Sequence, residues 1–414
     1  MKRTESVEVG TRPLLDVARA ARRAAALREA SAEFRRTGVA GADLPAIARG
    51  VGLTRSSLYN YCAGREDLAR QCYLESLAAL ESVLAATQGM PGSGLARVIA
   101  FVREATGHDR PIAAIAAELD LLPEDARAEI EREQVRAFDA LAALILSGQQ
   151  DGSIRACDPA IAARTIWGLV SWTPLGAMWA GPIGEDLSAR MEMALPDLIE
   201  RGIVSDGWRH QRGVVPADLL ASIWSARPDD RVEEIGRTAS SLFNRRGIEG
   251  VSLEDVAAAM GATKGLVYHH FESKAALVRH CFERGFAIYD RILDIAGAAP
   301  DGLEQTRRAI ALNAQAQLHA LHPMSPNAFY KRLSSADQAH FSEKSAALLE
   351  RSILIVECGT ADGLKRAVDA PAVALAAAGS FLFLGKWIPA NTRDPLTVAH
   401  EVSDLFLYGL CAPS

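Results

Sequence analysis

Hydroxyl, basic and phenolic side chains recur in two short clusters whose internal spacing is identical, 209 residues apart. The matching members are Thr54, Arg55 and Tyr59 in the first cluster and Thr263, Lys264 and Tyr268 in the second. Groups of this kind donate hydrogen bonds to phosphate oxygens, and an arginine can also pair with a guanine edge in the major groove. The chemistry that these residue types predict is binding of duplex DNA.

The clusters belong to a longer repeated segment. Residues 34–72 and 243–281 align without a gap and are identical at 12 of 39 positions. In each copy a glycine suited to a left-handed helix end, Gly52 or Gly261, stands two residues before the threonine that can cap the next helix. This order of signals predicts a helix-turn-helix unit in each copy.

Local signals place the helices of the second copy. We expect a helix over 231–246 that ends before Gly247, and a second helix capped by Ser252, with Asp255 completing a variant of the capping box. A short third helix should run from Lys264 to His270. In the first copy the corresponding signals are Gly38, Asp43 as the cap, Pro45 in the first turn and Thr54 as the next cap.

The rest of the chain of 414 residues predicts an all-α protein, because apolar residues follow helical spacing and no segment alternates long enough for a sheet. No window holds 18 uninterrupted apolar residues and the N-terminus lacks a signal-peptide core, so we expect a cytoplasmic, nucleoid-associated protein without a membrane segment. The net charge is −6, but residues 1–60 carry eleven basic and six acidic side chains, against eight of each in 227–280. The first copy should therefore attract phosphate more strongly.

The repeat extends beyond the helix-turn-helix units. Three further patterns recur in order: Gly148-x2-Asp151-Gly152 as Gly359-x2-Asp362-Gly363, Trp172-x-Pro174 as Trp387-x-Pro389, and Leu198-x3-Gly202 as Leu405-x3-Gly409. The repeated unit is thus a two-domain protein of about 200 residues. The expected divisions are 1–70 (N-terminal arm and first helix-turn-helix domain), 71–204 (first helical domain), 205–230 (linker), 231–279 (second helix-turn-helix domain) and 280–414 (second helical domain). The linker should pack partly on one unit, with Trp208 and Trp224 as anchors.

The segment Thr263–Lys274 resembles the TetR family of transcriptional regulators almost position for position. The resemblance implies that the short helix enters the DNA major groove, while the larger helical domain binds a small effector and pairs through its last two helices, here about 159–202 and 370–410. The residues expected to contact DNA are Thr54, Arg55, Ser56, Tyr59, Asn60, Tyr61, Arg65, Ser252, Thr263, Lys264, Gly265, Tyr268, His269, His270 and Lys274. Base reading should fall to Arg55, Ser56 and Asn60 and to Lys264, Gly265 and His269, with His270 packing inward.

The first copy departs from the family pattern after Tyr59. Cys62 replaces the usual aromatic residue, Gly64 replaces the helix-opening serine, and Arg65 replaces the lysine. These changes remove aromatic packing and weaken a cap by a few tenths of a kcal/mol, so the first copy could be the weaker reader. Its arginine-rich lead-in compensates electrostatically.

Aromatic and methionine residues in the helical domains are candidates for an effector pocket, although such residues more often fill a core. The candidates are Trp167, Trp172, Met178, His319, Phe329 and Trp387, with Trp179 beside the first group and His322, Pro323, Met324 and Tyr330 beside His319 and Phe329. A small apolar or acyl-type effector would suit them. No nucleophile with a base, metal-ligand spacing or phosphate-binding loop is present, so we expect no enzyme activity, cofactor or metal. The scattered cysteines are expected to be packing residues.

These observations predict a tandem, ligand-responsive repressor whose two units form a pseudo-dimer on an asymmetric, near-palindromic operator. Two alternatives stay open. Two chains could pair as a homodimer and present four DNA-reading heads, or only the second unit could read DNA while the first acts as a sensory or protein-interaction module.

Overall fold

The computed structural model describes residues 12–107, 118–180, 184–209, 213–223, 230–319, 321–324, 333–388 and 392–412. Within these ranges the chain is helical, and its strand-like contacts are two isolated bridges, so the all-α prediction is confirmed. We call the part up to Arg201 the N-terminal half. Its helices are α1 (Arg12–Thr37), α2 (Leu44–Gly50), α3 (Arg55–Leu58), α4 (Arg65–Gln88), α5 (Gly94–Thr106), η1 (Leu119–Leu121), α6 (Glu124–Gln150), α7 (Pro159–Trp179) and α8 (Gly184–Arg201).

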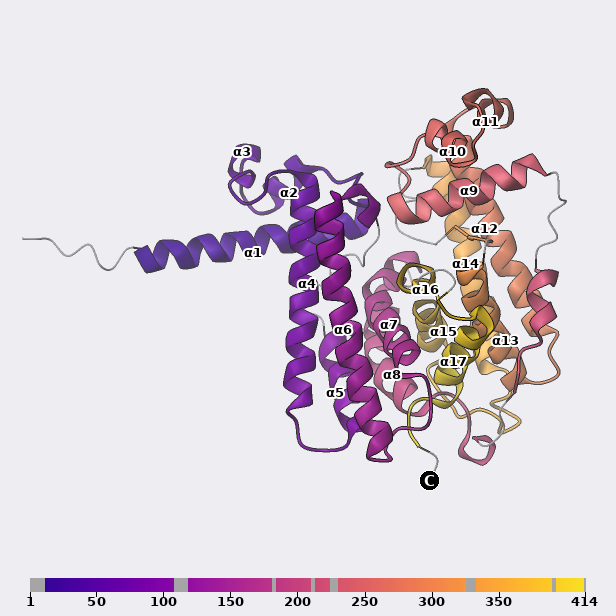
Figure 1. Ribbon diagram of the computed structural model, residues 1–414. Helices are drawn as coiled ribbons and strands as arrows, with labels where there is room; N and C mark the ends of the chain where they lie inside the picture. The colour runs from indigo at the N-terminus through magenta and orange to yellow at the C-terminus, as the bar shows by residue number, and fades with distance from the viewer. Residues whose placement is uncertain are drawn as a thin grey trace, which may run out of the picture.

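The C-terminal half begins at Arg231 and follows a similar order (Figure 1). Its helices are α9 (Arg231–Arg246), α10 (Leu253–Ala259), α11 (Lys264–His270), α12 (Lys274–Gly297), α13 (Gly302–Leu318), α14 (Ser335–Glu357), α15 (Ala370–Ala377), η6 (Ala378–Ser380), α16 (Leu384–Trp387) and α17 (Pro395–Tyr408). Two short 3₁₀ helices, η3 (Asp206–Trp208) and η4 (Ala217–Ser222), lie between the halves.

Helix boundaries near the repeated motif follow the local signals closely. Helices α9 and α11 have the predicted ends, and α10 opens with the predicted capping box, in which Ser252 and Asp255 each bond the other's backbone N–H. Two predicted caps are wrong. Asp43 and Thr263 occupy N-cap positions, but neither side chain makes a capping hydrogen bond. Asp43 instead forms a long ion pair with Arg49.

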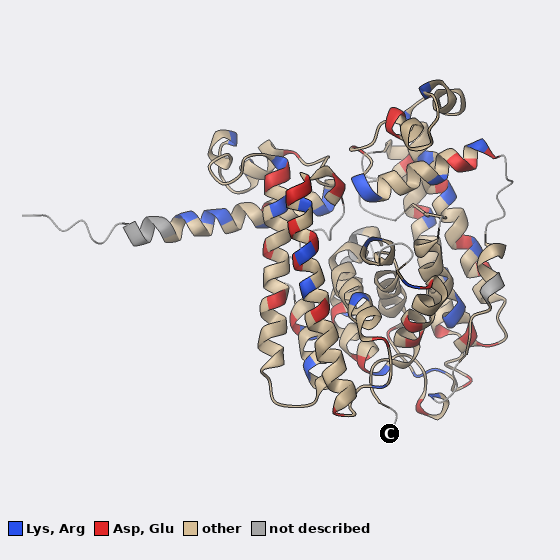
Figure 2. Ribbon diagram, in the orientation of Figure 1, with Lys and Arg blue, Asp and Glu red and all other residues tan. Residues whose placement is uncertain are grey.

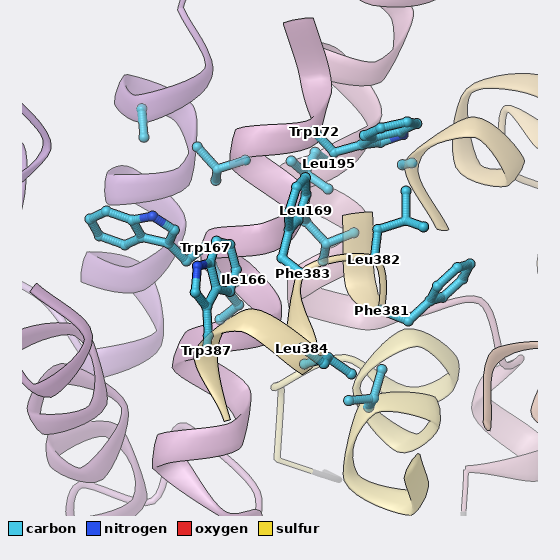
Figure 3. Close-up of a cluster of buried hydrophobic side chains, with 14 of the residues drawn as sticks. Ile166, Trp167, Leu169, Trp172, Leu195, Phe381, Leu382, Phe383, Leu384 and Trp387 are labelled. Atoms are coloured by element: carbon cyan, nitrogen blue, oxygen red, sulfur yellow. The ribbon is translucent and has the colours of Figure 1, made fainter. Parts of the chain in front are cut away.

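The two halves share one hydrophobic core. Helices α7 and α8 pack against α15, η6, α16 and α17, so the last helices of both halves meet side by side. Figure 3 shows Trp167, Trp172 and Phe383 within this shared cluster. The helices that the sequence assigned to pairing therefore do pack together within one chain.

The stretch Ala370–Trp387 is apolar enough to cross a membrane by length and composition, but 72% of it is buried in the protein. It is broken into α15, η6 and α16 where α7 crosses it. There the indole Nε1 of Trp172 donates to the carbonyl of Leu375 at 2.8 Å, and a Cβ on Gly379 would lie 2.7 Å from the Cβ of Trp172. The close approach of these backbones requires glycine at this crossing.

The closing turns of the two halves contact each other reciprocally. Arg155 Nε donates to the carbonyl of Gly409 at 2.6 Å, and Arg366 Nε donates to the carbonyl of Gly202 at 2.7 Å. Both glycines have a left-handed φ, 63° at Gly202 and 65° at Gly409, which favours glycine over other residues. The backbone N–H of Ile203 also donates to a carbonyl of α17. The closing turns of the two halves are thereby held in one joint.

The segment between the halves packs on the C-terminal half, as predicted. Val215 and Ile223 are buried, and the backbone N–H of Val215 donates to Nε2 of His400 at 3.2 Å. Trp208 is partly buried against the shared core, which confirms it as an anchor. The second proposed anchor, Trp224, lies outside the described residues.

Candidate nucleic-acid interface and effector cavity

The two short helices α3 and α11 lie at the same end of the molecule and are exposed (Figure 1). Tyr59 directly follows α3 and Tyr268 lies within α11, and the two have similar exposed fractions, 43% and 42%. A cation faces each ring: the Arg55 guanidinium lies 6.0 Å from the Tyr59 centroid and the Lys264 ammonium 5.0 Å from the Tyr268 centroid. All four side chains are exposed, as contact with a polyanion would require.

The N-terminal helix α3 has a single turn, which its threonine stabilises. Thr54 Oγ1 accepts from the backbone N–H of Ser57 at 3.1 Å, the cap that Thr263 lacks. Arg55, Ser56 and Asn60 are all exposed, as the base-reading prediction requires.

In the C-terminal half, Lys264 is engaged by a neighbouring carboxylate. Its ammonium forms an ion pair with Glu254 on α10, and this hydrogen bond lowers the pKa of Glu254. His269 and His270 are both exposed, with ring centroids 5.0 Å apart, so the expectation that His270 packs inward is wrong. Gly265 is exposed and has no side chain, so it can contact a base only through its backbone.

Arg65 and Lys274, expected at phosphates, instead brace the turn before the second helix of their own domain. Arg65 Nη1 donates to the carbonyl of Ala40 at 2.9 Å, and Lys274 Nζ approaches the carbonyl of Glu249 at 3.4 Å. Each bond ties the fourth helix of the domain to the loop that presents the helix-turn-helix. Ser252 is likewise occupied, since its hydroxyl bonds Asp255 at 2.5 Å.

Charge differs between the two DNA-reading surfaces. A shallow cleft in the N-terminal half is lined by Arg19 and Arg23 of α1 together with Asn60 and Tyr61 beyond α3. Figure 2 shows basic residues following α1 toward this cleft. We therefore expect phosphate attraction to concentrate on the N-terminal half.

Beside α11, by contrast, acidic side chains line a groove. Its carboxylates are Glu249, Glu254, Asp255 and Glu272. Their repulsion of phosphate offsets the attraction of Lys264. The C-terminal half must rely on individual contacts rather than on a basic field.

The substitutions in the first copy have the predicted packing consequences. Phe271 is buried, with its ring centroid 5.1 Å from that of His280. Cys62 at the matching position is also buried but supplies no ring, and its thiol makes a weak contact with the carbonyl of Leu58. Ser273 caps α12 by accepting from a backbone N–H, whereas Gly64 offers no side chain at the start of α4.

One buried carboxylate connects both DNA-reading domains and was not foreseen from the sequence. Glu118 accepts hydrogen bonds from the backbone N–H groups of Val39 and the following residue, and its carboxylate lies directly against Gly247 at the end of α9. Burial raises the pKa of Glu118 to about 7. Nearby, Asp120 pairs with Arg245 at 2.8 Å. The segment around η1 thus holds the two domains relative to each other.

A cavity of about 100 Å³ lies in the C-terminal half between α12, α13, α14, α15, η6 and α17. Its walls are mainly apolar, with Phe282, Phe286, Ile310, Leu348 and Leu382 among them. One wall residue, Trp179, comes from the N-terminal half at the end of α7. An apolar lining of this kind suits a small organic molecule.

Of the pocket residues expected from the sequence, Trp179 and Met324 line this cavity, whereas Trp167, Trp172, Trp387 and His319 do not. Trp167, Trp172 and Trp387 are buried in the shared core, where Trp387 stacks on Phe383 with ring centroids 5.1 Å apart. These aromatic side chains join the halves, because they fill the space where α7 meets the C-terminal half (Figure 3). His319 is exposed just beyond α13. The side chain of Met178 and all of Phe329 lie outside the described residues.

One wall residue, Asn313, is among three amide side chains buried on α13, with Gln315 and Gln317. Buried amides indicate hydrogen-bond partners or a ligand. Among the cysteines, Cys72 and Cys281 are buried at matching positions, and burial raises the pKa of each to about 12. The described residues contain no cluster suited to a metal ion.

Comparison with protein families identifies two segments. The family described as "Bacterial regulatory proteins, tetR family" matches residues 235–281, and "Tetracyclin repressor-like, C-terminal domain" matches residues 95–203. The chain is 27% identical over 197 residues to the HTH-type transcriptional repressor KstR2 of Rhodococcus jostii, covering 44% of this chain and 92% of that protein. It is 29% identical over 143 residues to KstR2 of Mycolicibacterium smegmatis, covering 33% and 69%.

Solved structures of similar fold include the TetR family regulator PfmR from Thermus thermophilus, which is 24% identical with a TM-score of 0.38 and covers 44% of this chain and 98% of that one. AibR in complex with isovaleryl coenzyme A and operator DNA is 25% identical with a TM-score of 0.33, covering 36% and 84%. Residues 95–203 and 235–281 are thus similar to the two domains of TetR-family transcriptional regulators.

Proposed function

We propose that this chain is a ligand-responsive transcriptional repressor made of two fused TetR-like units, residues 1–204 and 231–414. The units form an intrachain pseudo-dimer and bind one asymmetric, near-palindromic operator through α3 and α11. The cytoplasm, at the nucleoid, is the compartment where such a protein would act.

The observation that carries this proposal is the reciprocal joint between the halves. Arg155 contacts Gly409 just as Arg366 contacts Gly202, and these arginines and glycines stand at matching positions of the repeat. Reciprocal exchange of equivalent contacts is how two identical subunits meet across a two-fold axis. One chain can therefore supply both members of the pair that a helix-turn-helix regulator uses on two half-sites.

The two half-sites should differ, because the exposed residues of the two reading helices differ. Arg55 and Asn60 can make bidentate contacts to guanine and adenine, whereas Lys264 and His269 occupy the corresponding positions in the C-terminal half. The N-terminal half adds phosphate attraction from Arg19 and its neighbours.

Release from DNA would follow from occupation of the cavity in the C-terminal half. One wall helix, α12, packs against α9, and two other wall elements, α15 and η6, pack against α7. A bound molecule can therefore alter the relative position of the two reading helices. A ligand that binds one arrangement better than the other shifts the population toward it.

Selection of bound DNA from a random pool tests the proposal. The wild-type chain should enrich a site with two unequal halves, Arg55→Ala/Asn60→Ala should lose preference in one half, and Lys264→Ala/His269→Ala in the other. Light scattering should give the mass of one chain in solution. Footprinting should show that one bound chain protects about two half-sites. A symmetric site, or a dimer of chains with a doubled footprint, would refute the intrachain pseudo-dimer.

A second candidate function has an observation in its favour: the tetR family match covers 235–281, while α3 is a single turn. In that case only the C-terminal half reads DNA, and the N-terminal half is a sensory or interaction module. Replacing Arg55 and Tyr59 by alanine would then leave DNA affinity and its salt dependence unchanged. Under the pseudo-dimer proposal, the same variant binds more weakly and with a shallower dependence of affinity on salt.

A further inference from the structure

The polar groups of the cavity wall define the chemistry of its ligand, and most of them are already occupied. The hydroxyl of Tyr289 donates to the carbonyl of Met324 at 3.3 Å and accepts from Gln317 at 3.2 Å. The hydroxyl of Ser352 donates to the carbonyl of Leu348 at 2.8 Å. Neither wall residue has its donor free for a ligand.

No charged side chain lines the described cavity. The buried ammonium of Lys365 lies behind the wall, where it donates to Thr306 Oγ1 at 2.7 Å and to the carbonyls of Ile355 and Val356 at 2.6 and 3.3 Å. All three of its N–H groups are therefore used. Among the described residues, no free cation remains to meet a carboxylate or phosphate inside the cavity, and burying an unpaired charge is unfavourable.

Two polar wall atoms have no hydrogen-bond partner among the described residues: Nε1 of Trp179 and Oδ1 of Asn313. Asn313 is only 7% exposed, and its amide nitrogen donates to the carbonyl of Ala309 at 2.8 Å. That bond orients the amide and leaves its oxygen as a free acceptor. Buried polar atoms are nearly always paired, so an unpaired donor and an unpaired acceptor on one cavity indicate a missing partner.

We propose that the cavity binds an uncharged, largely apolar molecule bearing a hydroxyl group, which accepts a hydrogen bond from Trp179 and donates one to Asn313. This inference rests on the proposed effector role of the cavity and specifies its ligand class. Trp179 belongs to the N-terminal half, whereas Asn313 belongs to the C-terminal half. The ligand is therefore held by both halves at once, and its binding is coupled to their joint through α7.

Three naphthalene probes separate the required features in the full-length protein. 2-Naphthol carries both a donor and an acceptor, 2-methoxynaphthalene keeps only the acceptor, and 2-naphthoate carries a charge. By titration calorimetry, 2-naphthol should bind roughly fivefold more tightly than 2-methoxynaphthalene, as one net hydrogen bond of about 1 kcal/mol predicts. 2-Naphthoate should bind at least tenfold more weakly than 2-naphthol.

Variants assign each hydrogen bond to its residue. Asn313→Leu, which keeps the volume, should bring the affinities of 2-naphthol and 2-methoxynaphthalene together. Trp179→Phe should weaken both by a similar factor, because both probes offer an oxygen acceptor. Ser352→Ala, on the same wall but with its hydroxyl already bonded, and Trp208→Phe, outside the cavity, should leave the ratio unchanged.

The wild-type measurement tests the proposal even if a variant fails to fold. Equal affinity for 2-naphthol and 2-methoxynaphthalene, comparable binding of 2-naphthoate, or no binding of any probe would overturn it. None of these measurements involves DNA. Intact probe selectivity in a chain that fails the operator selection would reject the proposed repressor function and leave the ligand class standing, and the reverse result would reject only the ligand class.

Discussion

The crossing of α7 over η6 should be intolerant of a single added methyl group. A Cβ on Gly379 would lie 2.7 Å from the Cβ of Trp172 and 2.9 Å from both the carbonyl oxygen of Gly168 and the Cα of Leu169. Favourable carbon–carbon contacts begin at about 3.5 Å, so the backbones of the two halves must separate by roughly 0.8 Å to admit Gly379→Ala. All of the obstructing atoms are backbone or Cβ atoms, which cannot rotate away.

The expected loss follows from two opposing effects. Overpacking of a well-packed core destabilises by about 1–3 kcal/mol, while replacing glycine by alanine stabilises by roughly 0.4–1 kcal/mol through the unfolded chain. Gly297→Ala, at the end of α12, is a matched control because a Cβ there would meet nothing within 4 Å. The control has only the favourable effect, so the two variants should differ in unfolding free energy by about 1–3 kcal/mol, the steric contribution alone.

Urea unfolding followed by circular dichroism measures this difference. Gly168→Ala should also destabilise, because its Cβ would overlap the carbonyl of Gly379. The double variant at Gly168 and Gly379 should lose less than the sum of the two single losses, since the first substitution already separates the backbones. If Gly379→Ala proves as stable as Gly297→Ala, the packing described for the joint between the halves is incorrect.

Three further outcomes follow from individual side chains. Because burial raises the pKa of Glu118 from 4.5 to about 7, its stabilising contribution is fully present below pH 4.5 and is lost as the pH rises through 7. Unfolding free energies of wild type and Glu118→Gln across pH 4.5–8 should therefore diverge in favour of the variant, by up to about 1.4 kcal/mol per pH unit; parallel curves would contradict this. Glu254→Gln should free Lys264 for DNA and tighten operator binding several-fold at low salt in a gel-shift titration, and weaker binding would argue against a DNA contact for that lysine. Arg155→Met and Arg366→Met should each lower the unfolding free energy by about 1.5–3 kcal/mol, the range for a charge-assisted hydrogen bond, and an effect confined to one of them would contradict the reciprocal joint.

Much of each DNA-reading domain could be predicted from the sequence. The helix from Lys264 to His270 and the capping box of Ser252 with Asp255 were located correctly, because caps act on backbone groups within about four residues. The same local logic was wrong for Thr263 and Asp43. Each of these residues occupies an N-cap position, but its side chain makes no hydrogen bond to the free N–H groups of the helix. Whether such a bond forms depends on the side-chain rotamer, which the packing of neighbouring residues selects.

The side chains with competing partners could not be assigned from the motif. Lys264 and Arg65 carry charges suited to DNA, yet one pairs with Glu254 and the other bonds the carbonyl of Ala40. A spacing pattern indicates which residues share a helix face. The pattern does not indicate which hydrogen-bond acceptor of another segment will lie within bonding distance of these side chains.

The sequence by itself determined that the chain is helical, that one segment pattern occurs twice and that the first copy has a cysteine and a glycine where the second has a phenylalanine and a capping serine. Each of these depends on composition, periodicity or contacts within one turn. Only the tertiary structure decided that Trp172 and Trp387 join the two halves instead of lining a cavity, and that Trp179 lines the cavity of the opposite half. The physical reason is that these positions depend on close packing between segments about 200 residues apart. The close approach of the backbones at Gly168 and Gly379 determines which side chains are buried in the core and which line the cavity.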